Sequence, residues 1–403
     1  MNILFFSIRM PNLSQDTGMY GDLVKEFVEN GDKVYVVAPL LNNDSIKKTH
    51  ISIENKIEVL RVKVPEVFGI SNIKKGIAYP RMILKYINAV NKYFKNKKIE
   101  IAIFHTPPPE NGILVKYIKK KFNCFTYLIL RDFTWQDAVG FGFFKKNSLI
   151  CKYYQKLDGI LYKTLDSIGC MSQANIDCVL NDYPKIKKEK FHILNNFQKQ
   201  FKDMSSDKSF RTQLGINDKF IVIYGGNTSI AQKIEHLLVL AESCKEYKDI
   251  VFLLLGRGSY FEKIKLEANK KQLNNILFHD LIPKTEYKKL LNTCDVGLIV
   301  LNEQLSTPNI PSKSMDYFNA KIPIIASLDY VTDYGKILED INAGLWSYSG
   351  NNIDLKNNLL RLYNNKEERI EMGKNGYDYF INNMLPIHAY KIIIENYRLW
   401  NTK

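Results

Sequence analysis

The residues best placed for chemistry lie between Thr307 and Ser327, where a polar loop precedes a short amphipathic helix and a buried strand. We expect the helix to begin at about Pro311, because proline lacks only an N–H that a first helical turn leaves unpaired. The remaining first-turn N–H groups, the helix dipole and Lys313 predict an anion site. Asp316, about one turn later, could bind sugar hydroxyls beside that anion. The combination suits a nucleoside diphosphate, although loop–helix–strand units also recur without any ligand.

Two glycine-containing loops in the same half of the chain each follow a buried strand, at Gly225–Asn227 and Gly256–Gly258. Glycine lets the backbone approach a ligand closely, and Arg257 suits a bidentate phosphate contact. Either loop alone could be a tight turn. Because the carboxyl ends of parallel strands meet at one edge of a sheet, the two loops and the preceding segment together predict a nucleotide site, with Lys233 as a further donor.

Strand and helix patterns alternate through the first half of the chain and predict a doubly wound, mostly parallel α/β sheet. The predicted strands are Ile3–Ile8, Lys33–Pro39, Ile57–Val64, Glu100–Phe104, Phe125–Leu130, Asp166–Ser172 and Phe191–Leu194. The predicted helices are Gly18–Glu29, Tyr79–Phe94 and Glu110–Lys121, with helical stretches on to about Thr164.

The alternation restarts after a polar and charged stretch at residues 198–215, which predicts a linker. The later predicted strands are Phe220–Tyr224, Val251–Gly256, Ile276–Phe278, Val296–Leu301 and Ile322–Ala326, and the helices are Ile230–Cys244, Tyr260–Lys271 and Tyr287–Asn292. We therefore expect two Rossmann-like domains, residues 1–200 and 201–385, that face one another across a ligand-binding cleft. A last helix in residues 386–403 could dock on either domain.

Positive charge is concentrated in the first half of the chain. Residues 1–200 hold 31 Lys and Arg against 18 Asp and Glu, whereas residues 201–403 hold 26 against 24. Such an asymmetry indicates that one domain meets an anionic surface: a membrane, a nucleic acid or an acidic polymer. Aromatic residues and lysines alternate in Phe141–Lys146 and Leu149–Lys156, which favours an anionic membrane as the partner. Aromatic residues of the core beside solvated lysines would give the same pattern. No nucleic-acid recognition module accompanies the charge, so we expect no nucleic-acid partner.

The six cysteines form no CxxC pair and no cluster with histidine, so we expect reduced cysteines and no zinc site. The chain begins directly with an apolar strand rather than a signal peptide, and no apolar run reaches the roughly 20 residues that span a bilayer. These features predict a cytoplasmic protein.

Several blocks resemble the donor domain of family 4 glycosyltransferases, which have the two-domain GT-B fold. The blocks are Tyr224–Asn227, Ala231-Gln232, Leu254–Gly258, Asp280–Lys284, Cys294–Leu298 and Pro311–Tyr317. In the first half, His105–Pro109 and Arg131–Trp135 are similar to the subgroup that builds O-antigen and capsule repeats, including fucosamine transferases. The resemblance spans essentially the whole chain, and Pro311–Tyr317 is its most specific part.

The resemblance implies a retaining, metal-independent transferase that needs no cofactor. It would move a sugar, an N-acetylated or deoxy hexose, from a UDP-sugar to a polyprenyl-diphosphate-linked glycan in surface polysaccharide biosynthesis. Residues 1–200 would bind the acceptor and face the membrane, and residues 201–385 would bind the nucleotide-sugar. The enzyme would be peripheral on the inner face of the cell membrane.

The chain departs from the family pattern at several site positions. In the E-x7-E motif, Asp316 matches the second carboxylate, but the first would fall at Pro308. Asn227 and Gln232 stand where the family usually has the arginine and lysine of its diphosphate clamp. Lys313 and Arg257 are the cations that we expect to replace them.

The resemblance and the loops together assign the candidate residues. The donor-binding candidates are Gly18, Gly226, Asn227, Lys233, Arg257, Leu281, Ile282, Pro311, Ser312 and Asp316. The catalytic candidates are Asp132, His105 and Lys313. Asp132 could instead cap a helix, and His105 could be a buried histidine at a strand end. Two other functions stay open: a UDP-sugar epimerase of the same fold, and a non-catalytic subunit that binds a sugar nucleotide.

Overall fold

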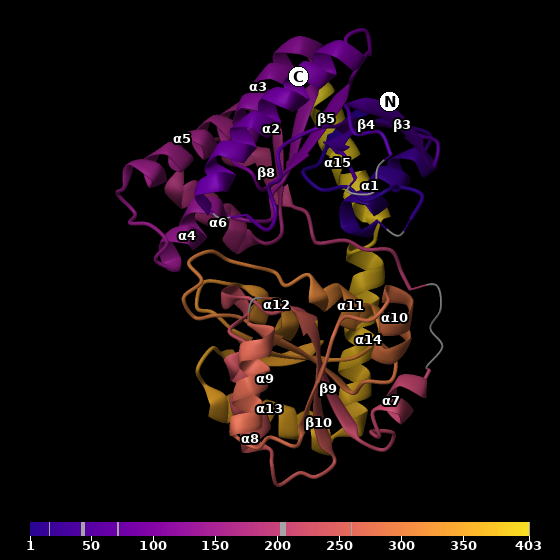
Figure 1. Ribbon diagram of the computed structural model, residues 1–403, viewed down its shortest axis with the longest axis vertical. Coiled ribbons are helices and arrows are strands. Elements are labelled where there is room, and N and C mark those ends of the chain that lie inside the picture. The colour runs from indigo at the N-terminus through magenta and orange to yellow at the C-terminus, as the bar shows by residue number, and fades with distance from the viewer. Residues whose placement is uncertain (16, 42–44, 71, 202–206, 259, 403) are drawn as a thin grey trace. The chain divides into compact units, whose positions relative to one another are not determined.

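The computed structural model describes the chain except residues 16, 42–44, 71, 202–206, 259 and 403. The chain divides into two compact units (Figure 1). Unit 1 contains Met1–Lys199 and Pro386–Lys403, and unit 2 contains Gln200–Leu385. Residues 202–206 of the predicted linker lie outside the described part of the chain.

Unit 1 is built on a sheet with the strand order β3-β4-β2-β1-β5-β6-β7-β8. Its strands are β1 Asn2–Phe6, β2 Lys33–Pro39, β3 His50–Glu54, β4 Ile57–Val62, β5 Ile101–His105, β6 Phe125–Ile129, β7 Ser167–Cys170 and β8 Phe191–Ile193. All neighbours pair in parallel except β3, which runs antiparallel to β4 at the edge. Its helices are α1 Gly18–Glu29, α2 Asn72–Tyr93, α3 Asn111–Phe122, α4 Thr134–Gly140, α5 Leu149–Thr164, α6 Gln173–Asp182 and α15 Pro386–Asn401, with a 3-10 turn at Lys188–Lys190.

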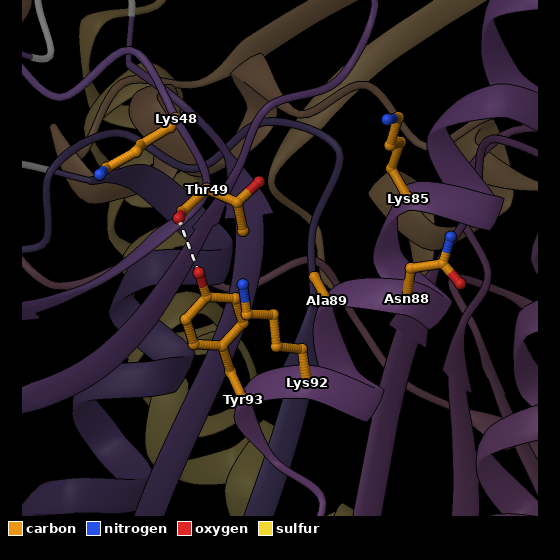
Figure 2. A pocket seen from close by; sticks show the side chains of 7 residues that line it. All are labelled: Lys48, Thr49, Lys85, Asn88, Ala89, Lys92 and Tyr93. Atoms are coloured by element: carbon orange, nitrogen blue, oxygen red, sulfur yellow. Dashed lines mark hydrogen bonds between the residues drawn. The ribbon is translucent and has the colours of Figure 1, made fainter.

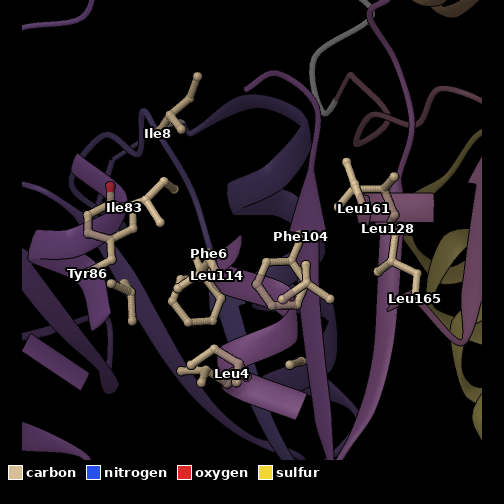
Figure 3. Close-up of a cluster of buried hydrophobic side chains, with 14 of the residues drawn as sticks. Leu4, Phe6, Ile8, Ile83, Tyr86, Phe104, Leu114, Leu128, Leu161 and Leu165 are labelled. Carbon is tan, nitrogen blue, oxygen red and sulfur yellow. The ribbon is translucent and has the colours of Figure 1, made fainter. Parts of the chain in front are cut away.

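Two apolar cores cover the two faces of this sheet. Leu4 and Phe6 of β1 pack in one core with residues of α2, α3 and α5, as Figure 3 shows. Ile3 and Phe5 of the same strand pack in the other core, with residues of α1 and α15. Successive side chains of a strand point to opposite faces, so a strand covered on both faces needs an unbroken apolar run. This is why the strands were readable as continuous apolar segments.

The last helix, α15, belongs to unit 1 although unit 2 precedes it in the sequence. It packs against α1, as Figure 1 shows, and against β6. Ile393 and Ile394 are buried in the core beside α1, and the Trp400 ring lies 5.5 Å from the Phe125 ring, between centroids. Sequence alone left its docking side open, and these contacts place it.

Unit 2 contains a wholly parallel sheet with the order β11-β10-β9-β12-β13-β14. Its strands are β9 Phe220–Asn227, β10 Ile250–Arg257, β11 Ile276–His279, β12 Val296–Val300, β13 Ile324–Leu328 and β14 Gly344–Tyr348. Its helices are α7 Ser209–Gln213, α8 Glu235–Ser243, α9 Phe261–Lys270, α10 Lys284–Leu291, α11 Lys313–Asn319, α12 Tyr334–Asp340, α13 Asn352–Asn364 and α14 Lys366–Asn383, with a 3-10 turn at Ile230–Gln232. Val222, Phe252 and Leu298 form its core with residues of α8, α9 and α13.

The structure differs from the sequence-based expectations at several elements, and helices α6 and α7, of which α7 lies within the predicted linker at residues 198–215, were not expected. The edge strand β3 was missed, because Ile51 and Ile53 point outward and leave a weak pattern. The strand β14 was missed as well. Helix α2 begins earlier than expected and continues through Pro80, where buried Ala78 and Met82 hold it against the sheet despite the lost backbone hydrogen bond.

Candidate functional site

The two glycine loops of unit 2 lie side by side at the carboxyl ends of β9 and β10. Gly226 pairs with Gly256 in the parallel register, and the Thr228 N–H donates to the Arg257 carbonyl at 2.9 Å. A Cβ at Gly256 would lie 2.6 Å from the Gly226 carbonyl oxygen. Gly226 itself has φ +127°, a backbone conformation that side chains disfavour. The close approach therefore requires glycine.

The polar residues of these loops are accessible to a ligand. Asn227 and Arg257 end their strands as register partners, and both are exposed. Leu281, which is exposed, and Ile282, which is half-buried, follow the edge strand β11 at the same end of the sheet. The structure thus places the predicted donor residues of these three loops at neighbouring strand ends.

Two tyrosine hydroxyls lie against Gly225, at the carboxyl end of β9. The Tyr317 hydroxyl of α11 accepts from the Gly225 N–H at 3.2 Å and lies 3.2 Å from the carbonyl oxygens of Ile223 and Leu298. The Tyr287 hydroxyl occupies the space that a Cβ at Gly225 would fill. Sequence analysis gave neither tyrosine a role. Tyr317 ties the β9 loop to α11, and Tyr287 packs α10 against the same loop.

Lys313 is the buried cation of the site. Its Nζ lies 3.5 Å from the centroid of the Tyr224 ring and has no hydrogen-bond partner among the described residues. Burial lowers the pKa of Lys313 from 10.5 to about 7, and the nearby Asp316 carboxylate opposes the shift. The ring face stabilises the ammonium only in part, because a buried charge also needs hydrogen bonds or a counter-charge. An anion entering here would supply both.

The helix at this site begins later than expected. Its first residue is Lys313, with Ser312 at the N-cap, so Pro311 precedes the helix rather than opening it. The Pro311 carbonyl accepts from the Ser314 Oγ at 2.6 Å, and the Tyr334 hydroxyl donates to that Oγ at 2.7 Å. Pro311 is buried and Ser312 is exposed, which leaves Ser312 as the accessible one of the two.

A charged network beside the first loop was not expected. Lys233 pairs with Glu303, and the other carboxylate oxygen of Glu303 accepts from Ser349 at 3.2 Å. Gln232 is also engaged, because its amide oxygen caps the turn that begins at Ser229. Glu303 follows buried β12, and that position at a strand end was the only sequence signal that could have found it.

In unit 1, His105 ends β5 and is almost fully buried. Its ring stacks on Tyr20 of α1 at 4.2 Å between centroids, and its Nδ1 lies 3.2 Å from the Thr106 carbonyl oxygen. Its Nε2 lies 3.3 Å from Ser7 Oγ. Burial lowers the pKa of His105 to about 4, and the Arg131 charge contributes. The ring is therefore neutral near pH 7 and has partners for both nitrogens.

Asp132 lies in the loop after β6, beside Arg131. The Thr106 Oγ1 accepts from the N–H groups of Arg131 and Asp132 at 2.9 and 3.2 Å, which ties this loop to the end of β5. Asp132 is accessible, and desolvation by the surrounding protein still raises the pKa of its carboxyl against the opposing charge of Arg131. Asp132 caps no helix, because the N-cap of α4 is Phe133.

Gly18 opens α1 with φ +66°. The loop before it is held by Arg61, which donates to the Met10 and Pro11 carbonyls at 2.7 and 3.0 Å. Arg61 also pairs with Glu54 at 2.7 Å, and both are buried. This pair positions the loop that Gly18 ends.

A cluster of buried acids in unit 1 was missed as well. Glu110 is fully buried at the N-terminus of α3, and neither carboxylate oxygen has a hydrogen-bond partner among the described residues. Burial raises the pKa of Glu110 to about 7. Burial and the charges of Glu110 and Asp182 raise the pKa of Asp158, on α5, to about 8. These acids hold protons at a pH where exposed carboxyls do not.

Within the described residues, no group of three or more His, Cys, Asp or Glu is arranged to hold a metal ion. No described helix is both long and apolar enough to cross a bilayer. All six cysteines are free, and only Cys178 is not buried.

The two α/β units, each built on a wholly or mostly parallel sheet, define the class of fold as GT-B. The chain superposes on HepE of Anabaena in complex with UDP-glucose with a TM-score of 0.70 and 12% identity, over 98% of both chains. At that identity the likeness concerns the fold alone. The prediction of two Rossmann-like α/β domains is confirmed.

Residues 206–379, which make up most of unit 2, match the family Glycosyl transferases group 1. The chain is also 23% identical over 226 residues to the probable glycosyltransferase WbjE of Pseudomonas aeruginosa, covering 54% of each chain. It is 24% identical over 132 residues to the putative colanic acid biosynthesis glycosyl transferase WcaI of Escherichia coli K12, covering 32% of each. The matched part thus spans about half the length of WbjE. The predicted likeness to family 4 glycosyltransferases is confirmed at the level of group 1 glycosyl transferases, and the likeness to O-antigen, capsule and fucosamine transferases stays a prediction.

Proposed function

We propose that the protein is a retaining glycosyltransferase that moves a sugar from a UDP-sugar to a lipid-linked glycan. One observation carries the proposal: the region that matches group 1 glycosyltransferases contains a buried ammonium, on Lys313, that has no hydrogen-bond partner among the described residues and lies beside the glycine loops of β9 and β10. A diphosphate would supply hydrogen-bond acceptors and further negative charge. HepE, of the same fold, carries UDP-glucose in its solved structure, which supports a UDP-sugar as the donor.

Each donor-binding residue has a distinct part in the proposal. Lys313 and Arg257 neutralise the diphosphate, and the Gly226 backbone lets it approach the sheet edge. Asp316 holds the ribose hydroxyls. Lys233 contributes less, because Glu303 already pairs with it.

The proposed chemistry needs neither a metal nor a cofactor. In a retaining front-face reaction the sugar–phosphate bond breaks as the acceptor hydroxyl attacks the same face of the sugar. The leaving diphosphate takes up negative charge, which fixed cations stabilise. Lys313 and Arg257 are the cations that stabilise it. The leaving phosphate oxygen takes the proton of the acceptor hydroxyl.

Unit 1 would supply the acceptor contacts. Asp132 is accessible and hydrogen-bonds an acceptor or sugar hydroxyl in our proposal. His105 is neutral near pH 7 and both of its ring nitrogens have partners, so a contact from Nε2 to the sugar would replace the contact to Ser7. The acceptor is a polyprenyl-diphosphate-linked glycan of surface polysaccharide biosynthesis, a proposal supported by the similarity to WcaI, a colanic acid biosynthesis transferase by name.

A membrane-facing surface is part of the proposal. Leu149, Phe143 and Tyr153 are exposed on and before α5, beside exposed Lys145 and Lys152. Apolar side chains among lysines suit the interface of an anionic membrane. We place the enzyme in the cytoplasm, peripheral on the inner face of the cell membrane, with no nucleic-acid partner.

A panel of UDP-sugars tests the function. The panel includes UDP-N-acetylhexosamines and their deoxy forms, since fucosamine is the donor class that the sequence resemblance suggests. Slow release of UDP by hydrolysis of one donor, accelerated by a lipid-linked glycan acceptor, is the expected result. Epimerised sugar without UDP release would instead identify an epimerase, and binding without turnover would identify a non-catalytic subunit. If no UDP-sugar binds, the proposal is wrong.

A further inference from the structure

Unit 1 contains a pocket of about 420 Å³ that none of the residues discussed above lines (Figure 2). Its lining residues are Lys48, Thr49, Lys85, Asn88, Ala89, Lys92 and Tyr93. The pocket lies beside the edge strand β3. Three strands, β4, β2 and β1, separate β3 from β5, which carries His105.

Two segments far apart in the sequence form this pocket. Lys85, Asn88 and Lys92 share one face of α2, because residues three, four and seven apart fall on the same side of a helix. Lys48 and Thr49 come from the segment that leads into β3. The Tyr93 hydroxyl donates to the Thr49 carbonyl at 2.9 Å and joins the two segments, as Figure 2 shows. The pocket therefore depends on the tertiary structure, which brings α2 and the segment before β3 together.

The lining carries three ammonium groups and no carboxylate. The acids of the neighbouring strands are already engaged, since Glu54 pairs with Arg61 and Glu58 pairs with Lys97. No ion pair is formed by Lys48, Lys85 or Lys92 among the described residues. Three like charges around one pocket create a positive potential that attracts an anion.

We propose that this pocket binds the phosphate group of a ligand. Lysine ammoniums bind phosphate as point charges, and three of them line this pocket. The Asn88 amide adds a neutral donor. Buried Ala89 and the half-buried Tyr93 ring form an apolar wall for the organic part of the ligand. The site is separate from the proposed donor site and does not depend on it.

Calorimetry with inorganic pyrophosphate tests the site in solution. The full chain is first saturated with UDP, so that the proposed donor site does not contribute. We expect Lys85→Gln with Lys92→Gln to lower the affinity at least about tenfold, because each lost charged contact is worth about one such factor. Lys85→Arg with Lys92→Arg keeps both charges and should restore binding. Both lysines are exposed, so the substitutions leave the core intact.

The matched control is Lys116→Gln with Lys120→Gln, which removes the same charge from exposed positions of α3. A second probe, phosphatidic acid in phosphatidylcholine vesicles, separates the sources of phosphate. Loss of pyrophosphate binding in the Lys85/Lys92 variant identifies a free phosphate ligand, and loss of vesicle binding alone identifies a lipid headgroup. The proposal is overturned if wild type binds neither probe. It is also overturned if Lys85→Gln with Lys92→Gln binds both probes as well as the control, Lys116→Gln with Lys120→Gln, does.

Discussion

Lys313 and Arg257 carry the same charge in opposite environments. Arg257 is exposed at the end of β10, where water solvates it, whereas the Lys313 ammonium is buried against the Tyr224 ring. Desolvation penalises the charged form of a buried lysine, which is why the pKa of Lys313 falls to about 7. The two residues should therefore respond differently to substitution and to pH.

Lys313→Met should weaken UDP binding roughly 10- to 100-fold, since a contact to a charged group is worth about 1.5–3 kcal/mol. Methionine keeps the apolar volume, so the fold should persist. Calorimetric titration with UDP measures the effect, and Lys336→Met, at an exposed position of α12, is the control. Unchanged affinity in Lys313→Met would remove this lysine from the diphosphate site.

The affinity for a UDP-sugar should fall as the pH rises above about 7. Lys313 has a pKa of about 7, so it is charged below that pH and neutral above it. The diphosphate of a UDP-sugar stays ionised throughout, so the lysine alone sets the trend. Titrations from about pH 6 to about pH 9 should show this decline in wild type, and a flat profile in Lys313→Met. A flat wild-type profile would contradict it.

Glu110→Gln should make the stability of unit 1 less dependent on pH. The folded-state pKa of Glu110 is raised from 4.5 to about 7, so the native state holds a proton that the unfolded chain has lost. Stability therefore falls as pH rises through this window, by about 3 kcal/mol in all. Urea midpoints at several pH values measure the slope. Exposed Glu66→Gln should keep the wild-type slope, and an equal slope in both variants would refute the prediction.

At the scale of elements, helix α5 has both buried and exposed apolar side chains. Cys151, Leu157 and Leu161 are buried, whereas Leu149, at 86% exposure, and Ile150 begin the helix in solvent. Phe144 stacks on Tyr154 at 6.3 Å between ring centroids, so part of the aromatic run packs within unit 1. Phe143 and Tyr153 remain exposed. The surface available to a membrane is therefore smaller than the sequence alone indicated.

Replacing Lys145, Lys146 and Lys152 with Glu should lower sedimentation with anionic vesicles. Each lysine near a charged bilayer contributes about 1 kcal/mol, so reversal of three charges should reduce binding by about 100-fold or more. UDP affinity, measured in parallel, should be unchanged because none of the substituted residues is a donor-binding candidate.

The matching control changes Lys185, Lys187 and Lys188 to Glu, which alters the net charge by the same amount at exposed positions of unit 1. If both triple variants lose vesicle binding equally, net charge rather than the α5 surface governs association.

At the scale of the whole molecule, the chain returns to unit 1 after completing unit 2. Ile393 and Ala389 of α15 are buried in the core that also contains Phe27 of α1. The Tyr390 ring lies 5.2 Å from the Phe27 ring, between centroids. Without α15 this face of the sheet would expose apolar surface to water.

Ile393→Ala should destabilise unit 1 by about 2–5 kcal/mol, the usual cost of truncating a buried isoleucine. Differential scanning calorimetry or a urea titration would show the loss in one unit. Ile370→Ala, in α14, is the control, because that side chain is exposed and should have little effect. A negligible effect of Ile393→Ala would mean that α15 is not docked as described.

Much of the site could be predicted because its elements are local in sequence. The glycine loops, Lys313 and Asp316 each follow a strand that an apolar run reveals. Glu110 and Tyr20 could not be found this way, and for Glu303 the strand end indicated its place but not its partners. Their burial and partners depend on elements that are distant in the chain, and no local pattern records those contacts.

The sequence by itself determined the alternation of strands and helices and the strand ends at which polar residues gather. Hydrophobic periodicity and turn residues are patterns of a few neighbouring positions, so they can be recognised without knowing the tertiary structure. Only the tertiary structure decided that α15 docks on unit 1, that Lys233 pairs with Glu303, and that the Lys313 ammonium lies buried on the Tyr224 ring. Burial and ion pairing depend on which distant segments meet, and that is a property of the packed chain.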